Sequence, residues 1–307
     1  MNVLQLVPKR RPFFDGQVRA LERRGVECTV VTVPGTYSPT SPRSVREYLR
    51  FYGRTLRAAI GRHDVVHANY GLLGPLALAQ PRRPVVLTLW GSDLMGEADW
   101  LTRLSRASAR LADATVLPSR AMASELPGSY TYIPFGVDTD LFRPIQRSAA
   151  RERVGWDREG AVALFPYDPA RPEKDYRLAK RVVERAPIDV RLEVVSSAPH
   201  EEMPHYLNAS DALLVTSTRE SGPMVAKEAA ACGVPVVSTD VGFVSEIPGA
   251  TVCETADGLA TALAGAVGDD RSVPDRPPVD EGEYGLDRMA ERLVSLYAEA
   301  TDGRATA

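Results

Sequence analysis

Two glutamates eight positions apart, Glu220 and Glu228, mark the segment of this chain whose residue types are best suited to chemistry. Ser221, Gly222 and Pro223 follow the first glutamate directly. A glycine lets backbone approach a ligand closely, a proline suits the first turn of a helix, and a carboxylate accepts hydrogen bonds from hydroxyl groups. The segment therefore predicts a loop that holds a ligand carrying hydroxyl groups.

The flanking sequence supplies the elements that would position these residues. The apolar run 211–216 predicts a buried parallel strand, and the alanine-rich run 225–231 predicts a helix that ends at Gly233, just before Pro235. Free N–H groups and the positive end of the helix dipole would then face an anion such as a phosphate. Two glutamates at this spacing also fit ordinary α/β packing, so the segment alone leaves both interpretations open.

The same alternation of strands and helices runs through the whole chain. Predicted strands cover residues 2–8, 26–33, 65–68, 85–89, 114–118, 162–166, 190–195, 212–216 and 234–238. Predicted helices cover residues 17–24, 44–62, 74–79, 101–111, 175–184, 203–208, 225–231 and 285–300. This order predicts an α/β fold with doubly wound parallel sheets. Because 307 residues exceed a comfortable single core, we predict domains 1–144 and 145–284, followed by a final helix within 285–307.

The glutamate segment resembles the nucleotide-sugar site of retaining glycosyltransferases of family 4. There the second glutamate of E-x7-E begins E-A-x-A-C-G-x-P-V-V, and residues 228–237 here read EAAACGVPVV. Further similar blocks occur in the family's order: HANYGLLG at 67–74, LTLWGSD at 87–93, IPFGVDTDLFRP at 133–144 and RPEK at 171–174. The resemblance spans most of residues 1–300 and is strongest to teichuronic-acid-type and other cell-surface polysaccharide transferases. It implies the GT-B fold, in which two Rossmann-like domains face a central cleft and the final helix packs back on the N-terminal domain.

The resemblance also implies roles at the donor site. Lys174 and Arg171 would hold the diphosphate of a nucleoside-diphosphate sugar, where they would stabilise the negative charge that develops as the bond to the sugar breaks. Glu220 would contact the sugar hydroxyls. The other donor contacts are expected from Ser221, Gly222, Pro223, Met224, Val225 and Glu228, the last of which would bind the ribose. Pro223 has no N–H and would only shape the loop.

The predicted acceptor-side or sugar-side residues are Gly16, His67, Trp90 and Asp93, from loops and strand ends of the N-terminal domain. A lone histidine at the end of a buried strand, such as His67, is also compatible with a purely structural role. The resemblance implies transfer of a hexosyl group from a UDP- or GDP-linked sugar to a glycan or lipid-linked acceptor. The leaving phosphate would accept the acceptor's proton, so no protein base is required.

Three positions depart from the family pattern. Trp90 stands where the family commonly has histidine, and an indole cannot take a proton. Phe135 replaces an asparagine, and Asp168-Pro169 stand where the family has Gly-Arg, which is why the arginine role is assigned to Arg171. These departures keep open the alternative of a non-catalytic GT-B partner in a glycan-assembly complex. A second alternative is a sugar-nucleotide 2-epimerase, because such epimerases share the fold.

Neither a cofactor nor a metal is expected. No Asp-x-Asp block stands at a predicted strand end, and we interpret Asp138-Thr-Asp140 as a turn. The three cysteines, Cys28, Cys232 and Cys253, lack metal-ligand spacing and predict small buried residues in a reducing compartment. We therefore expect a metal-independent, cytoplasmic protein.

The charge is distributed unevenly. Residues 1–144 contain 19 Lys and Arg against 12 Asp and Glu, a net of +7, and the remaining 18 and 28 give residues 145–307 a net of −10. Within 44–62 a predicted amphipathic helix carries apolar positions at Val45, Leu49, Tyr52, Leu56 and Ile60, and arginines at 43, 46, 50, 54 and 57. It predicts either peripheral contact with an anionic membrane surface, on the inner face of the cell membrane, or a surface helix packed on its own sheet with a solvated arginine face. No nucleic-acid partner and no membrane span are expected.

Overall fold

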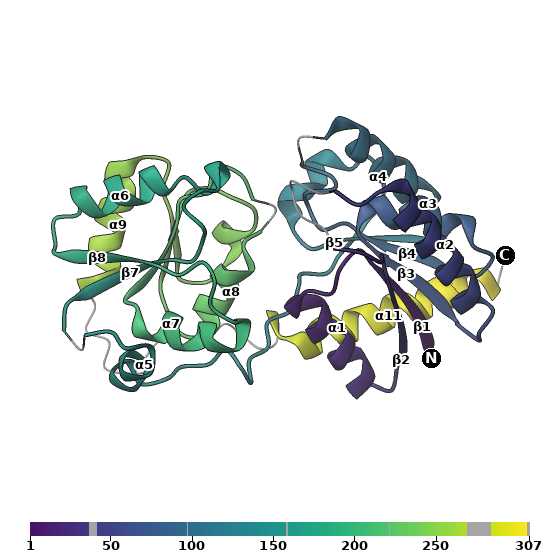
Figure 1. The fold of residues 1–307 in the computed structure, drawn as a ribbon, viewed down its shortest axis with the longest axis horizontal. Helices are drawn as coiled ribbons and strands as arrows, with labels where there is room; N and C mark the ends of the chain where they lie inside the picture. Colours follow the sequence, from purple (N-terminus) through teal and green to yellow (C-terminus); the bar gives the residue numbers. More distant parts are fainter. Residues whose placement is uncertain (37–41, 97, 158, 221, 269–283, 306–307) are drawn as a thin grey trace. The chain divides into compact units, whose positions relative to one another are not determined.

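The structure is a computed structural model that describes residues 1–36, 42–96, 98–157, 159–220, 222–268 and 284–305 (Figure 1). It divides into two compact units. Unit 1 comprises Met1–Gly136 and Leu286–Ala307, and unit 2 comprises Val137–Gly285. The first continuous stretch of unit 1 thus ends at Gly136 rather than at residue 144, and the C-terminal helix belongs to unit 1.

Unit 1 is built on a six-stranded parallel sheet with the order β2-β1-β3-β4-β5-β6. Its strands are β1 (Asn2–Val7), β2 (Glu27–Thr32), β3 (Val65–Asn69), β4 (Val85–Thr88), β5 (Ala114–Leu117) and β6 (Thr131–Tyr132). Every residue of β3 and β4 is buried. Helices cover both faces of such a sheet, which is why these strands are buried along their whole length rather than at alternate residues.

The helices of unit 1 form one layer on each face of this sheet (Figure 1). On one face, α1 (Pro12–Arg23) packs beside α11 (Leu286–Ala305), drawn in yellow, over Val3 and Val65. On the other face lie α2 (Val45–Ala59), α3 (Gly74–Ala79) and α4 (Asp99–Leu111). Leu4 and Leu6 of β1 point to this second layer, as the period of two along a strand requires.

Unit 2 contains a five-stranded parallel sheet with the order β11-β10-β9-β7-β8. Its strands are β7 (Ala161–Phe165), β8 (Val190–Val194), β9 (Ala212–Val215), β10 (Val236–Ser238) and β11 (Ala250–Val252). Its helices are α5 (Arg147–Val154), α6 (Tyr176–Arg185), α7 (Met203–Ala209), α8 (Met224–Ala231) and α9 (Ala256–Gly268). α6 and α9 pack on one face of the sheet, and α7 and α8 pack on the other. The α/β class and the doubly wound parallel sheets are confirmed.

Several predicted boundaries are wrong. α1 begins at Pro12, so Gly16 lies inside a helix rather than at the end of a loop. Proline occupies the first helical position because its missing N–H has no intrahelical acceptor there. Helices α5 and α9 were not predicted; the alanine- and glycine-rich sequence of α9 has little amphipathic contrast. Residues 139–141 form a turn, as expected for the Asp138-Thr-Asp140 stretch.

Within the described ranges, no helix has both the length and the apolar character needed to cross a membrane. The three cysteines are free thiols. Cys232 is buried, whereas Cys28 and Cys253 are only half-buried, which corrects the expectation that all three are buried.

Candidate functional site

The carboxyl edge of the unit 2 sheet brings two loops together. β7 is followed by the loop that contains Tyr167 and a short 3-10 turn, Pro172–Lys174, and β9 is followed by residues 216–220. Because β7 and β9 are parallel neighbours, both loops leave the same edge of the sheet. This edge is where open α/β sheets bind their ligands.

Lys174 and Glu220 meet at the centre of this edge. The Lys174 ammonium, on a residue only 4% exposed, forms an ion pair with Oε1 of Glu220. Ser217 Oγ donates to the same carboxylate oxygen at 3.1 Å. The ring of Tyr167 lies below the ammonium, 4.0 Å from Nζ to the ring centroid, in cation–π geometry. Lys174 and Glu220, which sequence reasoning assigned to the same donor site, are therefore in direct contact.

Burial and charge act in opposite directions on these groups. Burial lowers the pKa of Lys174 below its usual value, and the negative charge of Glu220 opposes this shift. Burial raises the pKa of Tyr167 well above its usual value, and the neighbouring Glu220 raises it further. An ammonium with little water around it interacts strongly with any further anion, because the local dielectric constant is low.

Hydrogen bonds from a side chain and from the backbone join the two loops to one another. Thr216 Oγ1 donates to the carbonyl oxygens of Lys174 and Asp175, at 2.9 and 3.0 Å. The N–H of Thr218 donates to the carbonyl oxygen of Glu173 at 2.9 Å. Asp175 has a positive φ of 44° and caps α6 by accepting from the N–H of Leu178 at 3.0 Å. Lys174 is thus held on a fixed backbone rather than on a free loop.

Arg171 is placed differently from Lys174. It is exposed, and its guanidinium donates from Nε and Nη2 to Oε1 of Glu173, at 2.8 and 2.6 Å. An exposed ion pair of this kind contributes little to stability, so it can exchange for another anion. The structure does not bring Arg171 into the Lys174–Glu220 cluster, and its diphosphate role stays a prediction.

The predicted donor loop continues into α8. Ser221 lies outside the described residues. Gly222 has φ +155°, and a Cβ placed there would lie 2.0 Å from Cε1 of Phe243, so a side chain does not fit. Pro223 precedes the helix, and the N–H groups of Met224 and Val225 fall in its first turn, where an α-helix supplies no acceptor. These are the N–H groups that the sequence predicts to face an anion, and that role stays a prediction.

Glu228 lies on α8 with a side chain that is 12% exposed. Burial raises the pKa of its carboxyl to about 8. Nδ1 of His200 is 4.0 Å from Oε1 of Glu228, and the His200 ring packs against the ring of Phe142 at a centroid distance of 5.1 Å. At neutral pH the Glu228 carboxyl is therefore mainly protonated, and such a group can donate one hydrogen bond and accept others.

Three of the four acceptor-side candidates, Gly16, His67 and Asp93, make contacts that stabilise the fold of unit 1. His67 is fully buried; Nδ1 contacts the Tyr297 hydroxyl at 2.6 Å and Nε2 contacts Thr88 Oγ1 at 2.7 Å. Burial lowers the pKa of His67 to about 3, so the ring is neutral. Gly16 allows α1 to approach Leu286 of α11 closely, because a Cβ there would lie 3.2 Å from that side chain. Neither residue offers a free polar group to a ligand.

The buried carboxylate of Asp93 accepts hydrogen bonds from the backbone of two loops. Its carboxylate accepts from the N–H groups of Trp90 and Gly91 at 2.9 and 2.8 Å, and from that of Gly71 at 2.7 Å. The residue is fully buried, and burial raises the pKa of the carboxyl while these N–H groups lower it. The aspartate therefore positions the loops that follow β3 and β4 and is not placed to touch an acceptor.

Trp90 belongs to an aromatic cluster at the carboxyl edge of the unit 1 sheet. Its ring centroid is 4.8 Å from that of Phe13 and 5.8 Å from that of Tyr70, and Phe13 lies 4.8 Å from Phe135. Tyr70 has φ 120°, a conformation that non-glycine residues rarely adopt and that is concentrated at functional sites. Trp90 and Phe135, two of the departures from the family pattern, thus both join this cluster.

Sequence reasoning missed several residues around the donor loop. Tyr167 and Ser217 contact Lys174 and Glu220, and Lys227 is buried with Nζ 4.1 Å from the ring centroid of Phe243. Tyr167 follows a predicted strand, so the strand-end rule could have singled it out. No spacing pattern connects Lys227 to Phe243, because only the fold brings them together.

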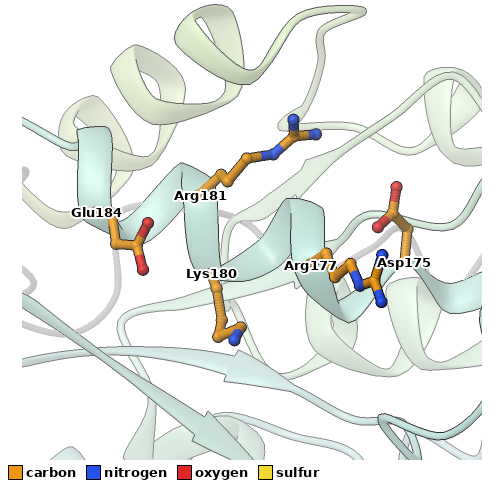
Figure 2. Close-up of a pocket in the computed structure, with 5 residues that line it drawn as sticks. All are labelled: Asp175, Arg177, Lys180, Arg181 and Glu184. Carbon is orange, nitrogen blue, oxygen red and sulfur yellow. The ribbon is translucent and has the colours of Figure 1, made fainter.

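A separate surface pocket of about 540 Å³ lies beside α6 (Figure 2). It is lined by Asp175, Arg177, Lys180, Arg181 and Glu184. Figure 2 shows Lys180 and Arg181 pointing in different directions from the helix. The side chains carry both signs of charge and do not converge on one point, so we assign no ligand to this pocket. Across the described ranges, no group of three or more His, Cys, Asp or Glu side chains could hold a metal ion.

Two family models match the chain, one in each unit. Residues 15–141 match the model described as Glycosyltransferase Family 4, and residues 173–264 match the model described as Glycosyl transferases group 1. The second match includes Lys174, Glu220 and Glu228. This chain belongs to the family 4 glycosyltransferases.

The family 4 chain is similar to several D-inositol 3-phosphate glycosyltransferases. It is 26% identical to the one from Frankia alni over 258 residues, which cover 62% of this chain and 62% of the relative. It is 28% identical to D-inositol 3-phosphate glycosyltransferase 2 from Catenulispora acidiphila over 309 residues, covering 79% of this chain and 66% of the relative. The chain thus spans less than two thirds of the length of these two relatives.

Solved structures of similar fold cover nearly the whole family 4 chain. Sucrose-phosphate synthase from Thermosynechococcus elongatus superposes with a TM-score of 0.77 at 18% identity, covering 97% of this chain and 99% of that one. Anabaena Alr3699/HepE in complex with UDP-glucose gives 0.70 at 16% identity, covering 97% and 100%. These likenesses show the fold class, GT-B, which is confirmed.

Proposed function

We propose that this chain transfers a glycosyl group from a nucleoside-diphosphate sugar to an acceptor, with the donor held by unit 2. The observation that carries the proposal is the buried Lys174–Glu220 pair at the carboxyl edge of the sheet. A cation and a hydrogen-bond acceptor side by side suit a ligand that carries a phosphate next to hydroxyl groups. The family membership supports the same assignment.

In this proposal Lys174 acts on the leaving diphosphate. As the bond to the sugar breaks, negative charge accumulates on the phosphate oxygens, and a cation already in position stabilises that charge without reorganisation. Glu220 then exchanges part of its contact with Lys174 for the sugar hydroxyls. The N–H groups at the start of α8 and Arg171 add to the positive field around the diphosphate.

Glu228 would bind the ribose of the nucleotide. A carboxyl group that is protonated near neutral pH both donates to one ribose hydroxyl and accepts from the other. We further propose a hexosyl group and a UDP- or GDP-linked donor, as expected from the sequence. The complexes of Anabaena Alr3699/HepE with UDP and with UDP-glucose are consistent with a uridine nucleotide.

Retention of configuration follows from the family-implied mechanism, in which the leaving phosphate takes the acceptor's proton on the same face of the sugar. No metal enters this scheme, because Lys174, Arg171 and the start of α8 supply the positive charge. We propose a glycan or lipid-linked acceptor in cell-surface polysaccharide or glycoconjugate synthesis, and a cytoplasmic site of action.

One observation favours a second candidate function. Trp90, which stands where the family commonly has histidine, is packed against Phe13 and Tyr70. An indole there cannot exchange a proton. A chain that assists a glycan-assembly complex without catalysing transfer would keep the donor site and lack the histidine, as this chain does. A 2-epimerase would instead release a changed sugar nucleotide without any acceptor.

A nucleotide-release assay separates these candidates. Purified protein is incubated with UDP-, GDP- and ADP-hexoses, with and without a glycolipid and glycan extract. Free nucleotide, donor binding and the identity of the remaining sugar nucleotide are measured. The transferase proposal predicts acceptor-dependent release from one nucleotide class, lost in Glu228→Ala. Donor binding with no release on any extract would favour the non-catalytic partner, and a changed sugar nucleotide without acceptor would favour the epimerase.

A further inference from the structure

Four aliphatic residues in and directly after α2 face solvent rather than the sheet. Val45, Leu49 and Leu56 are 75%, 66% and 37% exposed, and Ile60, the residue that follows the helix, is 79% exposed. The sheet-facing side of α2 is instead formed by Phe51, Thr55 and Ala59, which are buried. α2 therefore packs on its own sheet with a solvated arginine side, but the aliphatic residues of the predicted stripe are not the ones that face the sheet.

The four exposed aliphatic residues form one stripe along the helix. At about 100° per residue, they fall within an arc of about 60°. This aliphatic stripe (Val45, Leu49, Leu56 and Ile60) is about 22 Å long at about 1.5 Å per residue. Exposed aliphatic residues that share one face of a helix mark an interaction site more often than apolar residues scattered singly over a surface.

Arginines border the stripe on one side. Arg46, Arg50, Arg54 and Arg57 are all exposed and occupy the adjoining arc of about 80°. The helix thus has three sides. One side is buried against the sheet, one is aliphatic and faces solvent, and a basic side lies between these two. An aliphatic strip flanked by cations matches the boundary of a membrane that contains anionic lipid, where acyl chains lie beneath phosphate groups.

Hydrogen bonds within unit 1 hold α2 in place without any partner. The Glu47 carboxylate accepts from the N–H of Ser44 at 2.6 Å, which fixes the start of the helix. The hydroxyl of Tyr52 donates to the carbonyl oxygen of Ala79 at 3.0 Å and ties the helix to the end of α3. Docking of this surface therefore needs no folding step, which removes an entropic cost that disordered membrane anchors carry.

We propose that the aliphatic stripe and the four arginines beside it dock unit 1 on an anionic lipid bilayer. The aliphatic side chains enter the acyl boundary, and the guanidinium groups bind lipid phosphates, for which their planar donors are suited. The proposal is independent of the donor site, since no residue of α2 belongs to unit 2. It fits an acceptor that is itself anchored in a membrane.

Vesicle co-sedimentation of the full chain tests this surface. Vesicles of phosphatidylcholine alone are compared with vesicles that contain phosphatidylglycerol, at low and high salt. We expect binding to the anionic vesicles only, weakened by salt. Leu49→Ser/Ile60→Ser should lower the partition coefficient about tenfold or more through lost apolar insertion. Arg46→Gln/Arg50→Gln should remove the preference for anionic lipid.

Leu111→Ser is the matched control, because Leu111 is a 71% exposed aliphatic residue on α4, outside the stripe. It should bind vesicles like the wild type, and all variants should keep the wild-type melting temperature. Wild type that stays in the supernatant at low salt would overturn the proposal. A second result would also overturn it: the wild type is a dimer, and Leu49→Ser/Ile60→Ser makes it a monomer without changing vesicle binding. The stripe would then contact a second copy of the chain rather than lipid. Neither result depends on transferase activity.

Discussion

The side chains of Lys174 and Glu220 are joined by an ion pair across 46 residues of sequence, at the carboxyl edge of the unit 2 sheet. Both residues follow parallel strands, and both are held by loops that hydrogen-bond to one another. In the proposed reaction the lysine faces the leaving group and the glutamate faces the sugar. Replacing Lys174 and replacing Glu220 should therefore affect different properties of the protein.

Lys174→Met should lower kcat by about 10²–10³ and change KM much less. The ammonium acts mainly on charge that develops in the transition state, so its loss raises the barrier more than it weakens donor binding. Steady-state kinetics on the active donor checks this. Lys180→Met, an exposed lysine on α6, is the control and should retain wild-type rates. Equal kcat values in the two variants would show that Lys174 does not take part in the proposed reaction.

Glu220→Gln should destabilise the protein by about 1–3 kcal/mol, because it leaves the Lys174 ammonium buried without its counter-charge. Urea unfolding of the ligand-free protein measures the change. The double variant Lys174→Met/Glu220→Gln should lose less stability than the sum of the two single variants, since the residues are in contact. Strict additivity would show that the ion pair is not formed in solution.

The raised pKa of Glu228, about 8, makes stability depend on pH. The unfolded carboxyl loses its proton near pH 4.5, whereas the folded one keeps it to about pH 8. Between these values the folded state binds more protons than the unfolded state. The free energy of unfolding therefore falls as pH rises through this window, by at most about 1.4 kcal/mol for each increase of one in pH.

Glu228→Gln, which cannot ionise, should lack this fall. Urea unfolding from pH 5 to pH 9 compares the two proteins, and the variant should gain stability relative to wild type towards pH 9. Parallel pH profiles for wild type and variant would mean that Glu228 is solvated and carries an ordinary pKa.

Gly222→Ala should weaken donor binding and destabilise unit 2 by about 1–3 kcal/mol, because the added methyl group collides with Phe243. Gly233→Ala is the matched control. Gly233 also has a positive φ, of 70°, but nothing lies within 4 Å of its Cβ position. It should show only the conformational cost of about 1 kcal/mol and unchanged donor affinity. Melting curves and donor titrations on both variants make the comparison, and equal effects would exclude the Phe243 contact as the cause.

The sequence predicted the fold class well because its buried strands are continuous apolar runs. The predicted strand at 212–216 and helix at 225–231 differ from β9 and α8 by one residue at an end. The start of α1 was missed because Pro12, Phe13 and Phe14 looked like loop residues, although proline at the first helical position is favourable. Boundaries depend on such capping details, which periodicity does not detect.

Burial of single side chains was the harder quantity to predict. Asp93 and His67 have residue types typical of ligand contacts, yet both lie inside unit 1 with their polar atoms engaged. The reverse holds for the aliphatic stripe of α2, whose residues suggest a core but face solvent. The exposure of the stripe depends on the rotation of α2 against its sheet, and the burial of Asp93 and His67 depends on contacts that only the folded loops and strands make. A pattern of residue types leaves both undetermined.

The measurement that tests the central proposal most directly is a thermal-shift panel of UDP-, GDP- and ADP-sugars on wild type and on Glu228→Ala. A ligand that binds only the folded state stabilises it by about 2.7 kcal/mol at a hundred times its Kd. If unit 2 holds the donor as proposed, one nucleotide class raises the wild-type melting temperature and Glu228→Ala abolishes the rise. A wild-type protein that none of these nucleotides stabilises would contradict the proposal.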